Sequence, residues 1–324
     1  MDWMDMRRGL LLLLLALMAT PLAGLAQQMP QPPAPQLPSF KSGVELVTVT
    51  ATVRDRRGRL VKGLTSQDFE IYDAGVRRAI TNFRSDPSPV SLAILFDVSG
   101  SMRVADRATA AKFAAYHLIS WLESGRDEAA LFTFDSRLHE VAPFTVDTRA
   151  LQGALGEVDP FGATSLHDAI AEAARRAATR GGEGRRRAVV VITDGVDTAS
   201  RLTPSEVSAV ASEIDVPVYV IATVLPIDHP GREGSLVGQA TTPTEAGTVE
   251  DLAMWTGGSF FYASTPSDTS QTARQVIEEL REQYVIAFEP FAASRGWRPL
   301  EIRTRHKDLV VRTRSGYMAG GPRA

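Results

Sequence analysis

Cysteine is absent from the 324-residue sequence, and aromatic residues make up only 7% of it. Without a thiol, the chain can form no disulfide, and it has no thiolate to ligate zinc or an iron–sulfur cluster. Thiol catalysis and lipid attachment at a cysteine are excluded for the same reason. Stability must therefore come from core burial, and hydrophobic residues make up 44% of the chain.

Charge of one sign is also scarce. The sequence holds 35 Lys and Arg against 38 Asp and Glu, which gives a formal net charge of −3. Such a balance favours neither nucleic acid nor anionic lipid as a partner, so we expect no nucleic-acid binding. The five histidines are scattered without an HxxxH spacing, so the sequence does not support a zinc site.

Only one long apolar run is present, and it lies at the amino end. Two arginines precede an unbroken apolar stretch over Leu10–Ala19, and the small residues Gly24 and Ala26 follow it. This order predicts a signal peptide over residues 1–26 and export to the periplasm, the cell surface or the medium. An uncleaved membrane anchor is the alternative. After cleavage we expect no membrane insertion, because no second run of this length exists.

Residues 27–40 form a proline-rich linker, since proline cannot continue the interior of a helix or sheet. Apolar residues then alternate with polar ones over residues 41–87, for example around Val49, which predicts strands with one buried face. The same alternation returns over residues 283–324, around Leu300. Each β segment is too short to bury a good core alone. We therefore expect the two to pack together as a small β-sandwich.

The middle of the chain, residues 88–282, has a different pattern. It opens with Val90–Phe96, a near-continuous apolar run that is typical of a parallel strand buried on both faces. Apolar strands then alternate with helical segments. This order predicts an α/β fold with a doubly wound, mostly parallel sheet and helices on both faces, inserted between the two β segments.

Three segments place polar side chains beside the ends of these predicted strands and helices. DVSGS over Asp97–Ser101 follows the first strand, GATS over Gly162–Ser165 precedes a helix, and Asp194–Gly195 follow another strand. Open α/β sheets bind ligands where loops leave the carboxyl ends of their strands. Each residue also has a local alternative role, as a helix cap or a turn residue. The segments together offer five oxygen donors: Asp97, Ser99, Ser101, Thr164 and Asp194.

Three stretches resemble the three segments of the metal-ion-dependent adhesion site of von Willebrand factor A (VWFA) domains. In order, they are DVSGSM, FGATSLHDAI and VVVITDG. The flanks are similar to a bacterial VWFA-related family described chiefly from acidobacteria. They read LVTVTATVRDRRGRLVKGLTSQDFEIYDAGVRRAITNF before the domain, and LREQYVIAFEP and RTRSGY after it. The resemblance covers nearly all of the mature chain.

This resemblance implies a von Willebrand factor A fold over residues 88–282 and a complete metal site. Ser99, Ser101 and Thr164 would offer hydroxyls, and Asp97 and Asp194 would ligate the ion or hold its waters. Hard oxygen donors suit Mg²⁺, with Mn²⁺ or Ca²⁺ as alternatives. Because few carboxylates are bound directly, an acidic residue of a protein partner can fill an open position on the ion.

The function that follows is cation-dependent protein binding, either adhesion or scaffolding, and not catalysis. A haloacid-dehalogenase-like phosphatase needs a second aspartate where Ser99 stands, and no Gly-x-Ser-x-Gly elbow appears. A metal-stabilised envelope protein without a dedicated ligand remains an alternative, and a Mg²⁺-dependent hydrolase is less favoured. The partner, the ion and the oligomeric state stay open.

Other polar segments near these loops favour simpler roles. We expect Asp135, Asp168 and Asp197 to be solvated loop acids, although positions behind the metal ligands are the alternative. The glycine-rich, basic segment over residues 181–187 reads as a solvated connector, because it lacks the lysine of a phosphate-binding loop. Residues 225–247 form a long loop that either borders the metal face and sets partner choice or is merely mobile.

Overall fold

The computed structural model describes residues 46–156, 162–180, 184–223, 234–235, 243, 247–291 and 295–320. They lie in one compact unit, Val44–Ala324. The predicted signal peptide, the linker and most of the loop over residues 225–247 lie outside the described residues. Among the helices within these ranges, none has both the length and the apolar composition needed to cross a membrane.

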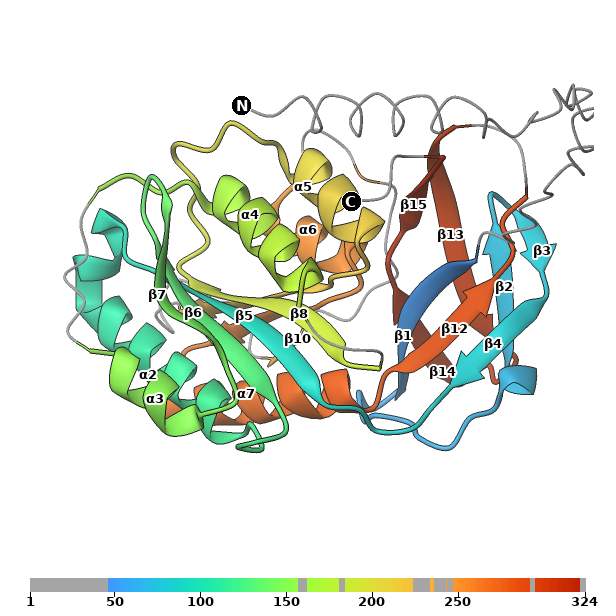
Figure 1. Ribbon diagram of the computed structural model, residues 1–324, viewed down its shortest axis with the longest axis horizontal. Coiled ribbons are helices and arrows are strands. Elements are labelled where there is room, and N and C mark those ends of the chain that lie inside the picture. Colours follow the sequence, from blue (N-terminus) through green and yellow to red (C-terminus); the bar gives the residue numbers. More distant parts are fainter. Residues whose placement is uncertain are drawn as a thin grey trace, which may run out of the picture. The chain divides into compact units, whose positions relative to one another are not determined.

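The middle of the chain builds a seven-stranded sheet in the order β10-β11-β9-β8-β5-β6-β7 (Figure 1). Neighbouring strands are parallel except at the two edges, where β7 and β10 run antiparallel to their neighbours. Every residue of the apolar strand β5 is buried, as its sequence predicts. The strands are β5 (Val90–Asp97), β6 (Glu128–Phe134), β7 (Leu138–Thr145), β8 (Arg186–Thr193), β9 (Val218–Thr223), β10 (Gly234–Ser235) and β11 (Phe260–Ala263).

Helices cover both faces of this sheet, which confirms the doubly wound α/β fold (Figure 1). Successive side chains of β5 point to opposite faces, so Ile94 packs with α2 and α7 while Leu95 packs with α4 and α5. The helices are the 3₁₀ helix η2 (Gly100–Asp106), α2 (Arg107–Ser120), α3 (Thr148–Ala154), α4 (Leu166–Ala178), α5 (Pro204–Glu213), α6 (Val249–Trp255) and α7 (Pro266–Arg281).

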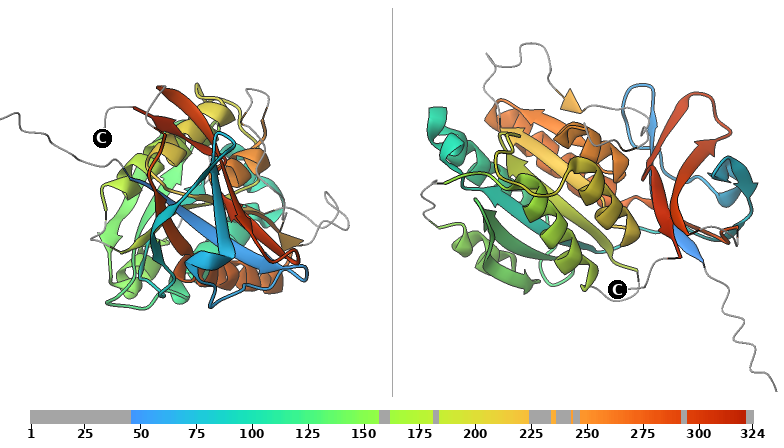
Figure 2. Two further views of the ribbon diagram at one scale, coloured as in Figure 1. Left: turned by 90° about the vertical axis from the view of Figure 1, so that its right-hand side faces the viewer. Right: turned by 90° about the horizontal axis from the view of Figure 1, so that it is seen from above.

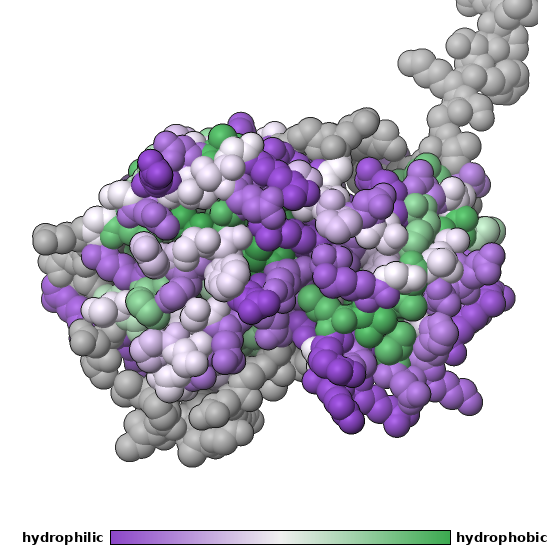
Figure 3. Space-filling view, turned by 90° about the horizontal axis from the view of Figure 1, so that it is seen from below, coloured by the Kyte–Doolittle hydropathy of each residue, from purple (hydrophilic) through white to green (hydrophobic). Residues whose placement is uncertain are grey.

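Helix α2 does not follow directly from the loop after β5. The 3₁₀ helix η2 occupies Gly100–Asp106, and α2 begins at Arg107. Its buried residues are Ala111, Ala114, Ala115, Leu118 and Ile119, whereas Phe113 and Tyr116 remain 40% and 48% exposed. Figure 3 views the molecule from the side of α2, α3 and α7, and it shows apolar residues in separate patches among polar ones.

The two ends of the described chain meet in a β-sandwich of two four-stranded sheets, ordered β14-β1-β12-β4 and β15-β13-β2-β3. Strand β1 pairs with β12 and β14, and β2 pairs with β13, so segments from before and after the α/β domain lie side by side (Figure 2). The expectation that the α/β domain is inserted between two β segments is therefore confirmed. The elements are β1 (Val47–Asp55), η1 (Ser66–Asp68), β2 (Phe69–Asp73), β3 (Val76–Arg78), β4 (Ile80–Arg84), β12 (Tyr284–Phe288), β13 (Gly296–Thr304), β14 (Leu309–Thr313) and β15 (Gly316–Ala319).

A buried carboxylate joins the sandwich to the α/β domain. Glu279 of α7 is 0% exposed and pairs with Arg54 of β1 and Arg312 of β14. Burial by itself raises the pKa of this carboxyl, but the two guanidinium charges outweigh burial and hold the pKa below its usual value. The pairing therefore stabilises the fold at neutral pH, and the stabilisation is lost as the pH falls through the folded-state pKa.

We expect Glu279→Gln to lower the free energy of unfolding by about 3–5 kcal/mol, because it leaves two buried guanidinium groups without their counter-charge. Urea denaturation at pH 7 measures the change. The neighbouring Glu278 is the matched control, since its side chain is 48% exposed and pairs with an exposed Arg274. Glu278→Gln should change stability by no more than about 0.5 kcal/mol. Equal losses in both variants would contradict this account of the contact.

Candidate functional site

Asp97, the last residue of β5, is completely buried, and both of its carboxylate oxygens accept hydrogen bonds. The backbone N–H of Ser99 donates to Oδ1 at 2.9 Å, and the hydroxyl of Thr193 donates to Oδ2 at 2.5 Å. Ser99 is also fully buried, and its Oγ lies 3.0 Å from the Oγ of Ser101. The first predicted segment therefore gathers one carboxylate and two hydroxyls at the end of β5.

Asp194 follows β8, the strand beside β5. Its Oδ2 accepts a hydrogen bond of 3.0 Å from Nη1 of Arg107, the first residue of α2. The Asp194 side chain is 2% exposed and that of Arg107 is 20% exposed, so the pair is largely shielded from water. The preceding residue, Thr193, reaches Asp97 with its hydroxyl, which brings the second carboxylate close to the first.

The third predicted segment reaches the other two through its backbone. The N–H of Gly100 donates to the carbonyl of Gly162 at 3.0 Å, and a Cβ added at Gly100 would lie 3.3 Å from that oxygen. Thr164 is 3% exposed, and its carbonyl accepts from the backbone N–H groups of Thr198 and Ala199 at 2.9 Å. These bonds hold the Thr164 loop against the segment that follows Asp194.

Burial, a neighbouring charge and hydrogen bonds together set the pKa of Asp97. Burial raises the pKa of the Asp97 carboxyl, and the charge of Asp194 raises it further, while hydrogen bonds from Thr193 and Ser99 act in the opposite direction. Within the described part of the chain, no group of three or more His, Cys, Asp or Glu side chains is placed to hold a metal ion. A cation at this edge would rest on two carboxylates and several hydroxyls, a hard oxygen donor set that fits Mg²⁺ chemistry.

Residues 92–196 match the family model of the von Willebrand factor type A domain. This span of the chain is therefore similar to a von Willebrand factor type A domain. The matched span contains all five of the donors predicted from the sequence. The narrower resemblance to the acidobacterial-type family stays a prediction.

Several solved structures are similar to this chain at low identity. BatB from Bacteroides thetaiotaomicron is 20% identical with a TM-score of 0.46, and the match covers 59% of this chain and 98% of BatB. A von Willebrand factor type A protein from Catenulispora acidiphila is 13% identical with a TM-score of 0.46, over 87% of this chain and 76% of that one. The manganese-loaded TRAP protein of Plasmodium vivax is 16% identical with a TM-score of 0.41, over 76% and 98%. No curated protein matches the sequence.

Two residues of the von Willebrand factor A domain that contact the predicted donors were not found from the sequence. Thr193 ends β8 and reads there as one more strand residue, yet its hydroxyl donates to Asp97 and accepts from the N–H of Gly195 at 3.0 Å. Arg107 lies beyond η2 and far from Asp194 along the chain, so no sequence motif connects the two residues. A polar residue at the carboxyl end of a buried strand was the only available signal, and it pointed to Thr193.

The loop acids are more strongly bonded than we expected. Asp168 accepts hydrogen bonds from the backbone N–H groups of Arg201 and Leu202 at 3.0–3.2 Å. Asp197 accepts from the N–H of Leu166 at 2.8 Å and from the hydroxyl of Ser200 at 2.6 Å. Both carboxylates remain partly exposed to solvent, and they also hold the start of α4 against residues 197–202.

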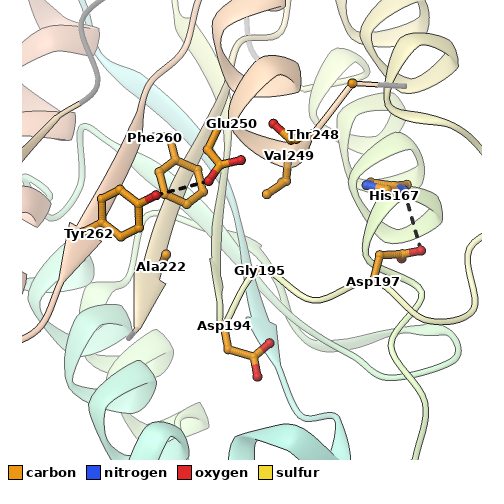
Figure 4. Close-up of a pocket in the computed structure, with 11 residues that line it drawn as sticks. His167, Asp194, Gly195, Asp197, Ala222, Thr248, Val249, Glu250, Phe260 and Tyr262 are labelled. Carbon is orange, nitrogen blue, oxygen red and sulfur yellow. Dashed lines mark hydrogen bonds and ion pairs between the residues drawn. The ribbon is translucent and has the colours of Figure 1, made fainter. Parts of the chain in front are cut away.

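A cavity of about 370 Å³ opens beside Asp194 at the same edge of the sheet (Figure 4). The close-up shows Asp194 on one side, the contact between His167 and Asp197 on another, and Glu250 opposite them. The Glu250 carboxylate accepts a 3.2 Å hydrogen bond from the hydroxyl of Tyr262. The cavity is lined by His167, Asp194, Gly195, Asp197, Ala222, Gly247, Thr248, Val249, Glu250, Phe260 and Tyr262.

We expect Thr193→Val to lower the free energy of unfolding by about 1–3 kcal/mol, because the buried Asp97 carboxylate loses a donor. Thr223→Val is the matched control. Thr223 is an equally buried threonine at the end of the adjacent strand, and its hydroxyl donates to the neutral carbonyl of Thr193. Its loss should cost about 0.5–1.5 kcal/mol. Chemical denaturation in EDTA compares the variants, and a Thr193→Val loss no larger than that of the control would contradict the role given to Thr193.

Proposed function

We propose that this protein is an exported binding module whose von Willebrand factor A domain holds a divalent cation of the magnesium class and uses it to capture an acidic protein partner. The proposed ligands are Asp97, Ser99, Ser101, Thr164 and Asp194. The observation that carries the proposal is the convergence of three distant loops at the carboxyl ends of β5 and β8, joined by the Asp97–Thr193 and Gly100–Gly162 hydrogen bonds.

The proposed ligands comprise neutral hydroxyl groups and charged carboxylates, which have different roles. Ser99 and Ser101 offer neutral hydroxyl oxygens that already lie 3.0 Å apart, and Thr164 would add a third from the neighbouring loop. Asp97 and Asp194 supply the negative charge that offsets the ion. When bound, the cation supplies a Lewis-acidic centre that a partner carboxylate can ligate. Mg²⁺ suits this oxygen set, and Mn²⁺ and Ca²⁺ are the alternatives to compare.

Binding fits this site better than catalysis. Asp97 stands where a nucleophilic carboxylate would stand, but both of its oxygens already accept hydrogen bonds from the chain itself. The position two residues further holds Ser99, whose hydroxyl faces that of Ser101. The proposed place of action follows from the predicted signal peptide, so we expect the partner in the periplasm or at the cell surface.

The proposal predicts that Mg²⁺ or Mn²⁺ raises the melting temperature of the purified protein relative to EDTA. An ion at about one hundred times its Kd adds about 2.7 kcal/mol of stability. Asp97→Ala and Thr164→Ala should remove this shift while the far-ultraviolet circular dichroism stays native. Asp308→Ala is the control, because it removes a carboxylate that is 75% exposed and lies in the sandwich; it should keep the full shift.

Capture of a partner is tested in the same variants. Immobilised protein should retain an envelope protein in Mg²⁺ and release it in EDTA, and Asp97→Ala should retain none. Retention that persists in EDTA, or in Asp97→Ala, would contradict cation-dependent capture. A Mg²⁺-dependent melting shift without any retained partner would favour the alternative of a metal-stabilised structural module.

A further inference from the structure

Arg107 places a fixed positive charge on one of the proposed ligands. Its guanidinium donates to Oδ2 of Asp194 at 3.0 Å, and both side chains are at least four-fifths shielded from water. The position of Arg107 follows from the local fold, because η2 begins at Gly100, directly after Ser99, and α2 begins at Arg107. The turn that holds the proposed hydroxyl ligands therefore also places the guanidinium of Arg107 beside Asp194.

The guanidinium group of an arginine side chain carries a positive charge. It therefore offsets part of the negative charge of Asp97 and Asp194. A divalent cation that approaches Asp194 meets both a carboxylate oxygen that is already engaged and a like charge a few ångströms away. At this degree of burial, water screens such a repulsion only partly.

We infer that Arg107 competes with the divalent cation for Asp194. Its guanidinium occupies Oδ2 of Asp194 when no ion is bound, and this weakens the affinity of the site for the ion. This inference rests on the proposed function. It adds that ion binding must displace the guanidinium from Asp194 or share the carboxylate with it. The start of α2 is then the part of the fold that responds first to the ion.

Three substitutions separate this competition from a general effect of charge. In metal-free protein titrated with Mn²⁺ and Mg²⁺ by calorimetry, Arg107→Gln should bind about tenfold more tightly than the wild type, since one unit of opposing charge is removed at close range. Arg107→Lys keeps the charge and should stay within about threefold. Arg103→Gln removes an exposed arginine of η2 and should change the affinity by about twofold or less.

The possible outcomes separate competition by Arg107 from the proposed cation-binding function. If the wild type binds the ions and Arg107→Gln binds them equally or more weakly, Arg107 positions Asp194 instead of competing, and the inference is overturned. Equal tightening in Arg103→Gln would overturn it as well, by showing a plain charge effect. If neither the wild type nor Arg107→Gln binds either ion, the proposed function itself fails.

A measurement on the unmodified chain guards against a variant that does not fold. The Nη1–H group of Arg107, which donates to Asp194, should be protected from exchange with water in EDTA when observed by nuclear magnetic resonance. Saturating Mg²⁺ should speed its exchange severalfold, as the ion takes over the carboxylate. The Nε–H of Arg312, which donates to the buried carbonyl of Gly257, is the internal reference and should not respond. Unchanged protection of Arg107 in saturating Mg²⁺ would overturn the inference.

Discussion

The hydrogen bond from Thr193 to Asp97 is the interaction on which the rest of the site depends. It links the ends of two neighbouring parallel strands, β5 and β8, and it gives a fully buried carboxylate one of its two donors. A buried charge is costly unless it is hydrogen-bonded, so the loops around it have little freedom to move away. Ser99 lies two residues after the end of β5, and Asp194 directly follows β8, so that constraint sets the positions of both.

A second buried carboxylate connects the α/β domain to the sandwich. Glu279 is buried as deeply as Asp97, but it has two arginines for partners where Asp97 has neutral donors. The contrast in pKa follows, since paired cations lower the pKa of Glu279 while burial raises that of Asp97. Two arginines of the fold offset the charge of Glu279, whereas the two hydrogen bonds to Asp97 come from neutral groups. This difference separates a structural contact from a candidate binding site.

Strands could be predicted where burial produces a regular pattern of apolar residues in the sequence. The continuous apolar run of β5 and the alternation in β1 are such patterns, and both strands form where expected. Strand β7 was missed because it is an edge strand with mostly solvated side chains, and α3 because it is short and buries only Leu151. The contact between Arg107 and Asp194 depends on which loops meet in space, and no local pattern records it. The ligand roles assigned to the five oxygen donors stay a prediction.

We propose that oxygens from three separate loops surround a hard divalent ion. Anomalous diffraction from crystals grown with Mn²⁺ measures this directly. We expect a single strong peak at the carboxyl ends of β5 and β8, within about 2.1–2.4 Å of the hydroxyl oxygens of Ser99 and Ser101. A fully occupied peak elsewhere, or crystals with no peak although the loops keep this arrangement, would contradict the claim.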